Sequence, residues 1–169
     1  GKLGLIAKAA ERLGLSCLQP VVADLLRLHE ARDDSGQPLV RQADRVLLDA
    51  PCSGTGVLAR RADLRWQREA KDLATLCRQQ DQMLDAAAAL VRPDGLLVYS
   101  TCSLEPEENE GRVAAFLERH PDFAQESAAG LVPPALLDES GAYRSLPQRH
   151  GMDGAYAARL RRRRMVARR

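Results

Sequence analysis

Two short apolar runs, each followed by a loop of small residues with a cysteine, place the strongest constraint on the fold of this chain. The first run is Arg45–Asp49, which Pro51 ends, and the second is Leu96–Thr101. A long stretch with apolar residues at helical spacing separates the two runs. Strands joined through a helix lie parallel in one sheet, with their carboxyl ends at the same edge. We therefore expect Cys52 and Cys102 to meet at the edge where open parallel sheets bind ligands.

The rest of the pattern predicts alternating helices and strands, typical of an α/β fold. Pro106, with acidic residues behind it, indicates the start of a helix. We expect helices over residues 3–13, 69–91 and 106–119, a strand over 16–23 that ends at Asp24, a surface loop over 32–42, and an antiparallel hairpin of residues 143–146 and 155–160 on the sheet edge.

The composition is that of an ordinary globular domain. The chain has 169 residues, of which 45% are hydrophobic, and no signal peptide or apolar run long enough to span a membrane. Its four cysteines are too few for a disulfide framework and have no zinc-type spacing. We expect a cytoplasmic, monomeric protein without a metal site or a membrane partner.

The charge is distributed unevenly. The net charge is only +2, yet seven of the last eleven residues are arginines, so the rest of the chain is acidic. A basic end on an acidic body suits contact with a polyanion. A solvated terminal strand with a frayed end is an equally simple interpretation of the same charges.

The four cysteines divide into two kinds. Cys17, in the expected strand, and Cys77, on the apolar side of the long helix, fit small buried hydrophobic residues. Cys52 and Cys102 lie just beyond their strands among small polar residues, where sulfur has no special packing use. A thiolate is a strong nucleophile, so covalent chemistry is the sharper hypothesis for this pair. A redox pair of the two thiols is an alternative.

Several blocks of the sequence resemble one family of RNA-modifying enzymes. The segments Asp49-Ala-Pro-Cys-Ser-Gly-Thr-Gly and Tyr99-Ser-Thr-Cys-Ser are similar to motifs IV and VI of the RNA cytosine-5 methyltransferases. Further blocks match in the family's order: Gln79-Gln80, Arg92-Pro-Asp-Gly, Glu105-Pro-Glu-Glu-Asn-Glu, and His150-Gly-Met-Asp-Gly. The segment Asp63-Leu-Arg-Trp most resembles the bacterial enzyme that methylates small-subunit ribosomal RNA.

The resemblance implies a reaction and roles for four residues. It makes Cys102 the nucleophile that adds to carbon 6 of a cytosine, so that carbon 5 can accept a methyl group from S-adenosylmethionine. Cys52 assists the later loss of the carbon-5 proton and of the enzyme thiol. Asp49 bonds the cytosine edge and lies near the cofactor, and Asp24 contacts the cofactor's adenine. Purely local interpretations remain, because aspartates at strand ends commonly cap the next turn.

A basic segment after the first cysteine loop is the candidate RNA-binding surface. Arg60, Arg61, Arg65 and Arg68 flank Trp66, and arginine for phosphate with an aromatic ring for stacking suits single-stranded or opened RNA. Such an enzyme needs its target base out of the stack. The alternative is a solvated helix start with Trp66 packed in the core.

In the family, a first strand and a glycine-rich cofactor loop precede the helix that opens this chain. We therefore expect residues 1–169 to form a partial catalytic domain: a Rossmann-like S-adenosylmethionine-dependent methyltransferase sheet, truncated at its N-terminus, with a C-terminal antiparallel hairpin. Weak or no cofactor binding, no activity in isolation, and an exposed, aggregation-prone sheet edge follow from that expectation.

Two other functions remain open at this point. An amino-group methyltransferase needs no thiol and typically has Asp/Asn-Pro-Pro-aromatic where this chain has Asp49-Ala-Pro-Cys, so the second cysteine argues against it. A non-catalytic RNA-binding module could keep the fold and the arginines. Ribosomal RNA as the substrate rests on the resemblance alone.

Overall fold

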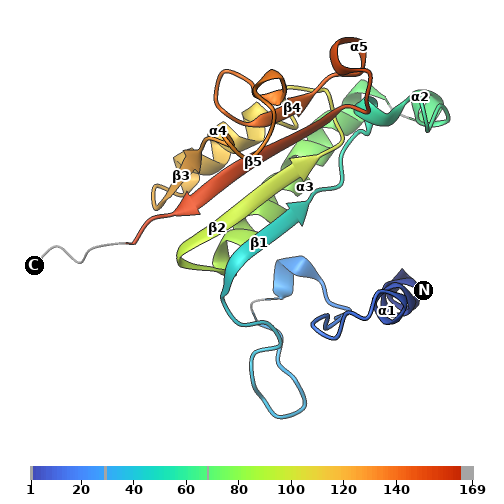
Figure 1. Cartoon of the computed structure of the whole chain (residues 1–169). Helices are drawn as coiled ribbons and strands as arrows, with labels where there is room; N and C mark the ends of the chain where they lie inside the picture. Colours follow the sequence, from blue (N-terminus) through green and yellow to red (C-terminus); the bar gives the residue numbers. More distant parts are fainter. Residues whose placement is uncertain (1, 29, 68, 165–169) are drawn as a thin grey trace, which may run out of the picture.

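The computed structural model describes residues 2–28, 30–67 and 69–164, and in this part of the chain five strands form one mixed sheet. The strand order is β1-β2-β5-β3, and β4 pairs with β5 beside this path (Figure 1). The strands are β1 (Ala43–Asp49), β2 (Val91–Thr101), β3 (Phe123–Glu126), β4 (Tyr143–Ser145) and β5 (Ala155–Arg162). The helices are α1 (Lys2–Arg12), α2 (Leu64–Gln67), α3 (Ala70–Ala89), α4 (Glu110–Arg119) and α5 (Pro147–His150), with short 3-10 turns η1 (Leu25–Arg27), η2 (Thr55–Val57) and η3 (Pro134–Leu136).

The pair β1 and β2 is parallel, and helix α3 connects the two strands, as the sequence predicts. Their register sets Asp49 opposite Ser100, so both strands reach the same edge of the sheet together. Helix α3 begins with a capping box in which Glu69 and Asp72 each accept a hydrogen bond from the other's backbone. The loops that follow β1 and β2, each of which carries a cysteine, therefore begin side by side.

Strand β5 runs antiparallel between β2 and β3. The predicted hairpin exists, because β4 pairs antiparallel with the start of β5. Its predicted place at the edge of the sheet is wrong for β5, which lies inside the sheet with β2 on one side and β3 and β4 on the other. The sequence analysis missed β3, a strand of only four residues whose apolar Phe123 alone is buried.

The core lies between the sheet and the two long helices. Helices α3 and α4 lie together behind the sheet in Figure 1. Their buried residues meet alternate positions of three strands, which is the period-two pattern of a sheet with one covered face. The core comprises Leu84, Ala87 and Ala88 of α3, Val113 and Phe116 of α4, Leu48 of β1, Leu97 and Tyr99 of β2, and Tyr156, Ala158 and Leu160 of β5, among others.

Two other elements differ from expectation. Residues 16–23 form no strand, because no strand lies beside them in the described part of the chain and an apolar run needs a hydrogen-bonding partner to become one. Helix α4 begins at Glu110, whereas Pro106 begins a turn. Asn109 at the N-cap and Glu108 before it are buried and directed to other partners. Within the described ranges, no helix has the length and apolarity needed to cross a membrane.

Candidate active site

The two cysteines that the sequence analysis singled out lie in contact. Cys52 follows β1 and Cys102 follows β2, and their Sγ atoms are 3.3 Å apart. Both are free thiols of intermediate exposure. The parallel register of β1 and β2 produces this proximity, because each cysteine comes two or three residues after the paired Asp49 and Ser100. The structure thus brings together the residues that the spacing predicted at this edge.

The two thiols differ in acidity. A hydrogen bond from the Cys52 thiol lowers the pKa of Cys102 from its ordinary value of 9.0 to about 7, against the opposing effect of burial. The same bond, together with burial, raises the pKa of Cys52. At neutral pH Cys102 is therefore about half thiolate, whereas Cys52 remains a thiol that can donate to it. A thiolate is the reactive form of cysteine, so Cys102 is the better nucleophile of the two.

Close backbone contacts join the two cysteine loops. The Gly56 amide donates to the Cys102 carbonyl at 2.9 Å, and the Gly154 amide donates to the Gly56 carbonyl at 2.8 Å. A Cβ on Gly56 would lie 2.3 Å from the Gly154 carbonyl oxygen, so only glycine permits this approach. The motif His150-Gly-Met-Asp-Gly thus packs its last glycine directly against the first cysteine loop.

Glu108 is a functional candidate that the sequence analysis missed. The acidic run after Pro106 was interpreted as a helix start, where acids favour the dipole. Glu108 instead has no exposed surface, and its carboxylate accepts a hydrogen bond from the Ser53 amide at 2.9 Å. The local pattern does not distinguish Glu108 from the neighbouring acids, because an acid near a helix start has a sufficient local explanation.

The two predicted cofactor carboxylates lie at different places. Asp49 is exposed at the end of β1 and accepts a hydrogen bond from the Ser100 hydroxyl at 3.0 Å, and its charge raises the pKa of Cys102. Asp24 caps η1 by accepting the Leu26 amide at 3.0 Å, so its local role is real. It also lines an open cleft of about 350 Å³ together with Val22 and neighbouring residues.

The predicted RNA-binding segment is a surface feature. The side chain of Trp66 is 87% exposed, so the alternative that packs it in the core is wrong. Arg61 and Arg65 are exposed as well, whereas Arg60 forms an ion pair with Asp153 at 2.9 Å. Arg68, also named by the sequence analysis, lies outside the described residues.

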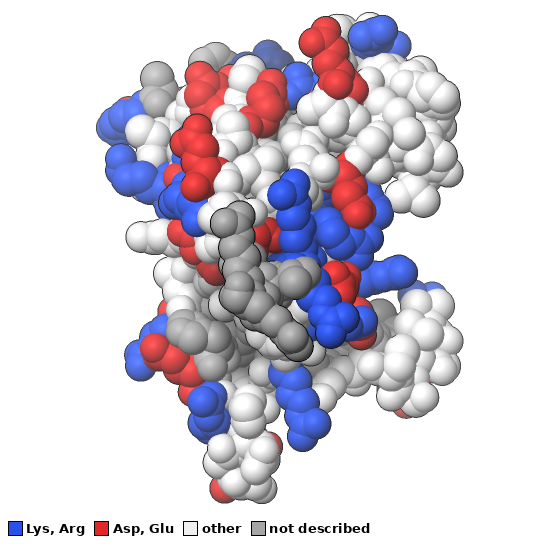
Figure 2. All heavy atoms as spheres, turned by 90° about the vertical axis from the view of Figure 1, so that its left-hand side faces the viewer, with Lys and Arg blue, Asp and Glu red and all other residues white. Residues whose placement is uncertain are grey.

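The arginines of β5 have acidic partners in the sheet. Arg159 and Arg161 pair with Glu126 of β3, and Arg162 pairs with Asp122. Figure 2, which looks at the face beside β3 and the end of β5, shows basic and acidic side chains next to each other. For these arginines the interpretation as part of a terminal strand is correct, and the last arginines of the chain lie outside the described residues.

The other two cysteines have separate surroundings. Cys77 is buried on α3, as predicted. Cys17 is exposed, contrary to prediction, because the segment around it is not part of the sheet. Neither is part of the Cys52–Cys102 pair, so the candidate site contains two of the four cysteines.

A family comparison identifies the family of this chain. Residues 2–161 match the family described as 16S rRNA methyltransferase RsmB/F. The chain belongs to this family. The match covers nearly all of the described sheet and both cysteine loops.

Individual relatives agree with the family. The chain is 38% identical over 161 residues to a probable ribosomal RNA small subunit methyltransferase B of Synechocystis sp., covering 94% of this chain and 35% of the relative. It is 40% identical over 156 residues to ribosomal RNA small subunit methyltransferase B of Thermus thermophilus, covering 92% and 36%. Among solved structures, NSun6 from Pyrococcus horikoshii with SFG superposes with a TM-score of 0.79 at 29% identity, covering 96% of this chain and 39% of that one. The chain thus spans about a third of the length of these curated relatives, and it shares the methyltransferase fold.

Proposed function

We propose that this chain carries the base-modifying part of an enzyme that transfers a methyl group from S-adenosylmethionine to carbon 5 of a cytosine in ribosomal RNA. The observation that carries the proposal is the Cys52–Cys102 contact of 3.3 Å, in which one sulfur is activated and the other donates. Direct methyl transfer to a nitrogen needs no thiol. A pair of polarised thiols at the ligand-binding edge of a methyltransferase sheet fits covalent catalysis.

The residues of the pair have complementary tasks. The Cys102 thiolate adds to carbon 6, and the electrons of the C5–C6 double bond make carbon 5 nucleophilic. After carbon 5 has gained the methyl group, its proton leaves to a base, the C5–C6 double bond re-forms, and the bond from sulfur to carbon 6 breaks with its electrons returning to Cys102. The Cys52 thiol, already hydrogen-bonded to Cys102, stabilises the departing thiolate. Asp49 lies at the same strand end and can accept a hydrogen bond from the cytosine amino group.

The chain has residues that fit part of the cofactor. S-adenosylmethionine supplies the methyl group when it is bound. The cleft at Asp24 combines a carboxylate, which can accept a hydrogen bond from an adenine amino group, with the apolar residues Val22, Ala23 and Leu39, which suit the face of the ring. Asp49, exposed at the end of β1, suits the charged methionine end. We propose Asp24 and Asp49 as the cofactor contacts of this chain.

The RNA contact is assigned to the surface after the first cysteine loop. Arg61 and Arg65 suit phosphates, and the exposed indole of Trp66 suits stacking on an unpaired base. The ion pair between Arg60 and Asp153 holds the Arg60 side chain beside η2, next to this surface. The substrate class is therefore a single-stranded or locally opened ribosomal RNA.

The covalent step is tested with RNA that carries 5-azacytosine, which traps the enzyme on the base. The chain is extended by an N-terminal segment that carries the family's glycine-rich cofactor loop and is incubated with this RNA and S-adenosylmethionine. We expect an adduct that denaturing electrophoresis resolves, its loss in Cys102→Ser, and its retention or accumulation in Cys52→Ser. An adduct that survives Cys102→Ser overturns the assignment of the nucleophile. RNA binding without methyl transfer by the extended protein supports the binding-module alternative instead.

A further inference from the structure

The carboxylate of Glu108 is a fully buried titratable group for which the proposed chemistry has no direct use. It accepts hydrogen bonds from the Ser53 amide at 2.9 Å, from the Ser53 hydroxyl, and from Nε2 of Gln80 at 2.9 Å. All of these partners are donors, and a carboxylate can only accept. A carboxylate without exposed surface is costly unless such donors replace water, so this set of bonds is what keeps it there.

These bonds fix the direction of a short hydroxyl chain. Because Ser53 donates its hydroxyl hydrogen to Glu108, the 3.0 Å contact between the Ser53 and Ser103 hydroxyls must have Ser103 as its donor. Ser53 directly follows Cys52, and Ser103 directly follows Cys102. One carboxylate is therefore linked to the residue behind each of the two sulfurs.

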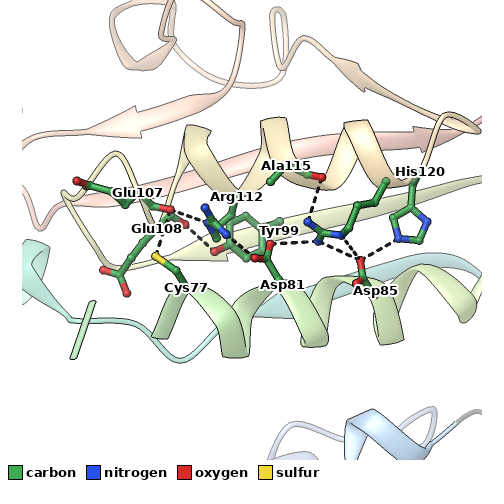
Figure 3. A network of polar contacts seen from close by, with 10 residues as sticks. Cys77, Asp81, Asp85, Tyr99, Glu107, Glu108, Arg112, Ala115 and His120 are labelled. Atoms are coloured by element: carbon green, nitrogen blue, oxygen red, sulfur yellow. Dashed lines mark hydrogen bonds and ion pairs between the residues drawn. The ribbon is translucent and has the colours of Figure 1, made fainter. Parts of the chain in front are cut away.

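The backbone that carries Glu108 is itself held in place by hydrogen bonds. The buried Tyr99 hydroxyl donates to the Glu108 carbonyl at 2.6 Å, and Arg112 Nε donates to the Glu107 carbonyl at 2.8 Å. Figure 3 shows these bonds along the contact between α3 and α4, where Arg112 also pairs with Asp81. The carboxylate therefore projects from a backbone that the helix layer anchors.

The charge of Glu108 does not explain its presence. That charge raises the pKa of Cys102, whereas the hydrogen bond from Cys52 has the larger and opposite effect. Glu108 thus opposes the thiolate through its charge and favours it through the geometry of the loops. Only the second effect gives this carboxylate a use at the site.

We propose that Glu108 is a positioning residue that clamps the two cysteine loops together, so that the Cys52 thiol stays in hydrogen-bonding contact with Cys102. The inference rests on the proposed function, because it names the residue that sets the geometry of the reactive pair. Glu108 acts through Ser53 and Ser103.

Two substitutions separate the effect of the side-chain length of residue 108 from the effect of its charge. In Glu108→Asp the charge remains, but the side chain is one methylene shorter and cannot hold Ser53. In Glu108→Gln the charge is removed and the reach remains: Oε1 can accept the Ser53 amide and Gln80, while the new amide donates to the Ser53 hydroxyl, whose hydrogen turns to Ser103. The same changes at Glu107, the exposed neighbour, are matched controls.

The measurement is the pH profile of Cys102 alkylation by iodoacetamide in the full chain, with the modified peptides resolved by mass spectrometry. We expect Glu108→Asp to raise the alkylation midpoint by about one pH unit, which slows the reaction at pH 6 about tenfold. Glu108→Gln and both Glu107 variants keep the midpoint of the parent chain or, for Glu108→Gln, lower it slightly. A role through charge alone predicts an unchanged midpoint in Glu108→Asp and a lowered one in Glu108→Gln, because the charge of Glu108 raises the pKa of Cys102. A Glu108→Asp midpoint equal to that of the parent chain therefore overturns the proposal.

A second variant keeps the test independent of the stability of Glu108→Asp. Ser53→Ala removes the hydroxyl chain and leaves the amide bond to Glu108 in place, so we expect a smaller rise of the Cys102 midpoint. No rise in Ser53→Ala overturns the clamp. Alkylation needs neither cofactor nor RNA, so failure of the clamp is distinguished from failure of the proposed function, which the azacytosine adduct tests.

Discussion

The Sγ atoms of Cys52 and Cys102 are in hydrogen-bonding contact at 3.3 Å, and this one contact makes two chemically identical side chains unequal. It lowers the pKa of Cys102 to about 7 and raises that of Cys52. Glu108 binds the residue after Cys52 directly and is linked to the residue after Cys102 through a hydroxyl. We propose that this inequality assigns the two tasks, with Cys102 as the nucleophile and Cys52 as the assisting thiol.

The first prediction concerns the acidity of Cys102. Because the thiolate reacts, alkylation of Cys102 should increase as the pH rises through about 7, well below the ordinary thiol value of 9.0. Cys52→Ala removes the donor and should move the midpoint upward by one pH unit or more. Cys52→Ser keeps a donating hydroxyl and should retain most of the low midpoint. Equal midpoints in both variants would show that the Cys52 hydrogen bond does not set the acidity.

The second prediction concerns Trp66. Because its side chain is 87% exposed, Trp66→Ala should leave the thermal unfolding midpoint unchanged. It should weaken binding of single-stranded RNA, since stacking of a base on an aromatic ring contributes about 1–3 kcal/mol. Trp66→Phe keeps a ring and should retain part of the affinity. Fluorescence anisotropy with a labelled oligonucleotide measures both, and equal affinity of Trp66→Ala and the parent chain removes Trp66 from the RNA surface.

The sequence predicts the part of this fold that depends on local apolar periodicity and on the rules for connecting strands. The β1–α3–β2 unit and the meeting of Cys52 and Cys102 follow from apolar periodicity and from the rule that parallel strands share an edge. Local pattern could not place β5 inside the sheet, because that position depends on which strand edges remain open once β2 and β3 have formed. The strand predicted over residues 16–23 is absent for the same reason, since a strand forms only where a neighbouring strand can pair with it.

The site shows the same division. The cysteines were predictable because sulfur among small polar residues after a strand has no packing purpose. Glu108 was not, because an acid near a helix start has a sufficient local explanation, and only the tertiary contacts with Ser53 and Gln80 reveal the other one. Residues whose local and tertiary roles compete are the ones that sequence reasoning misassigns.

The third prediction concerns the contact between Gly56 and Gly154. A methyl group at Gly56 would lie 2.3 Å from the Gly154 carbonyl oxygen and 2.8 Å from that of Cys102, so the loops must separate. We expect Gly56→Ala to lose about 1–3 kcal/mol of unfolding free energy and to raise the alkylation midpoint of Cys102. Gly4→Ala in α1 meets nothing within 4 Å, so it should not lower the unfolding free energy and should leave the alkylation midpoint unchanged. Urea unfolding measures the change in stability, and the alkylation profile measures the change in the Cys102 midpoint. A Gly56→Ala protein identical to the parent in both contradicts the prediction.

The last prediction concerns the outer edge of β1. In the described part of the chain β1 pairs only with β2, and Leu47 on it is 71% exposed. An open strand edge with an exposed apolar side chain favours pairing between copies, and lysine is a residue that natural edges use against it. We expect Leu47→Lys to reduce concentration-dependent association, measured by light scattering, without lowering the thermal midpoint. Leu131→Lys makes the same change at a loop residue of 64% exposure and should leave association as it is. If both variants reduce association equally, net charge rather than the β1 edge is the cause.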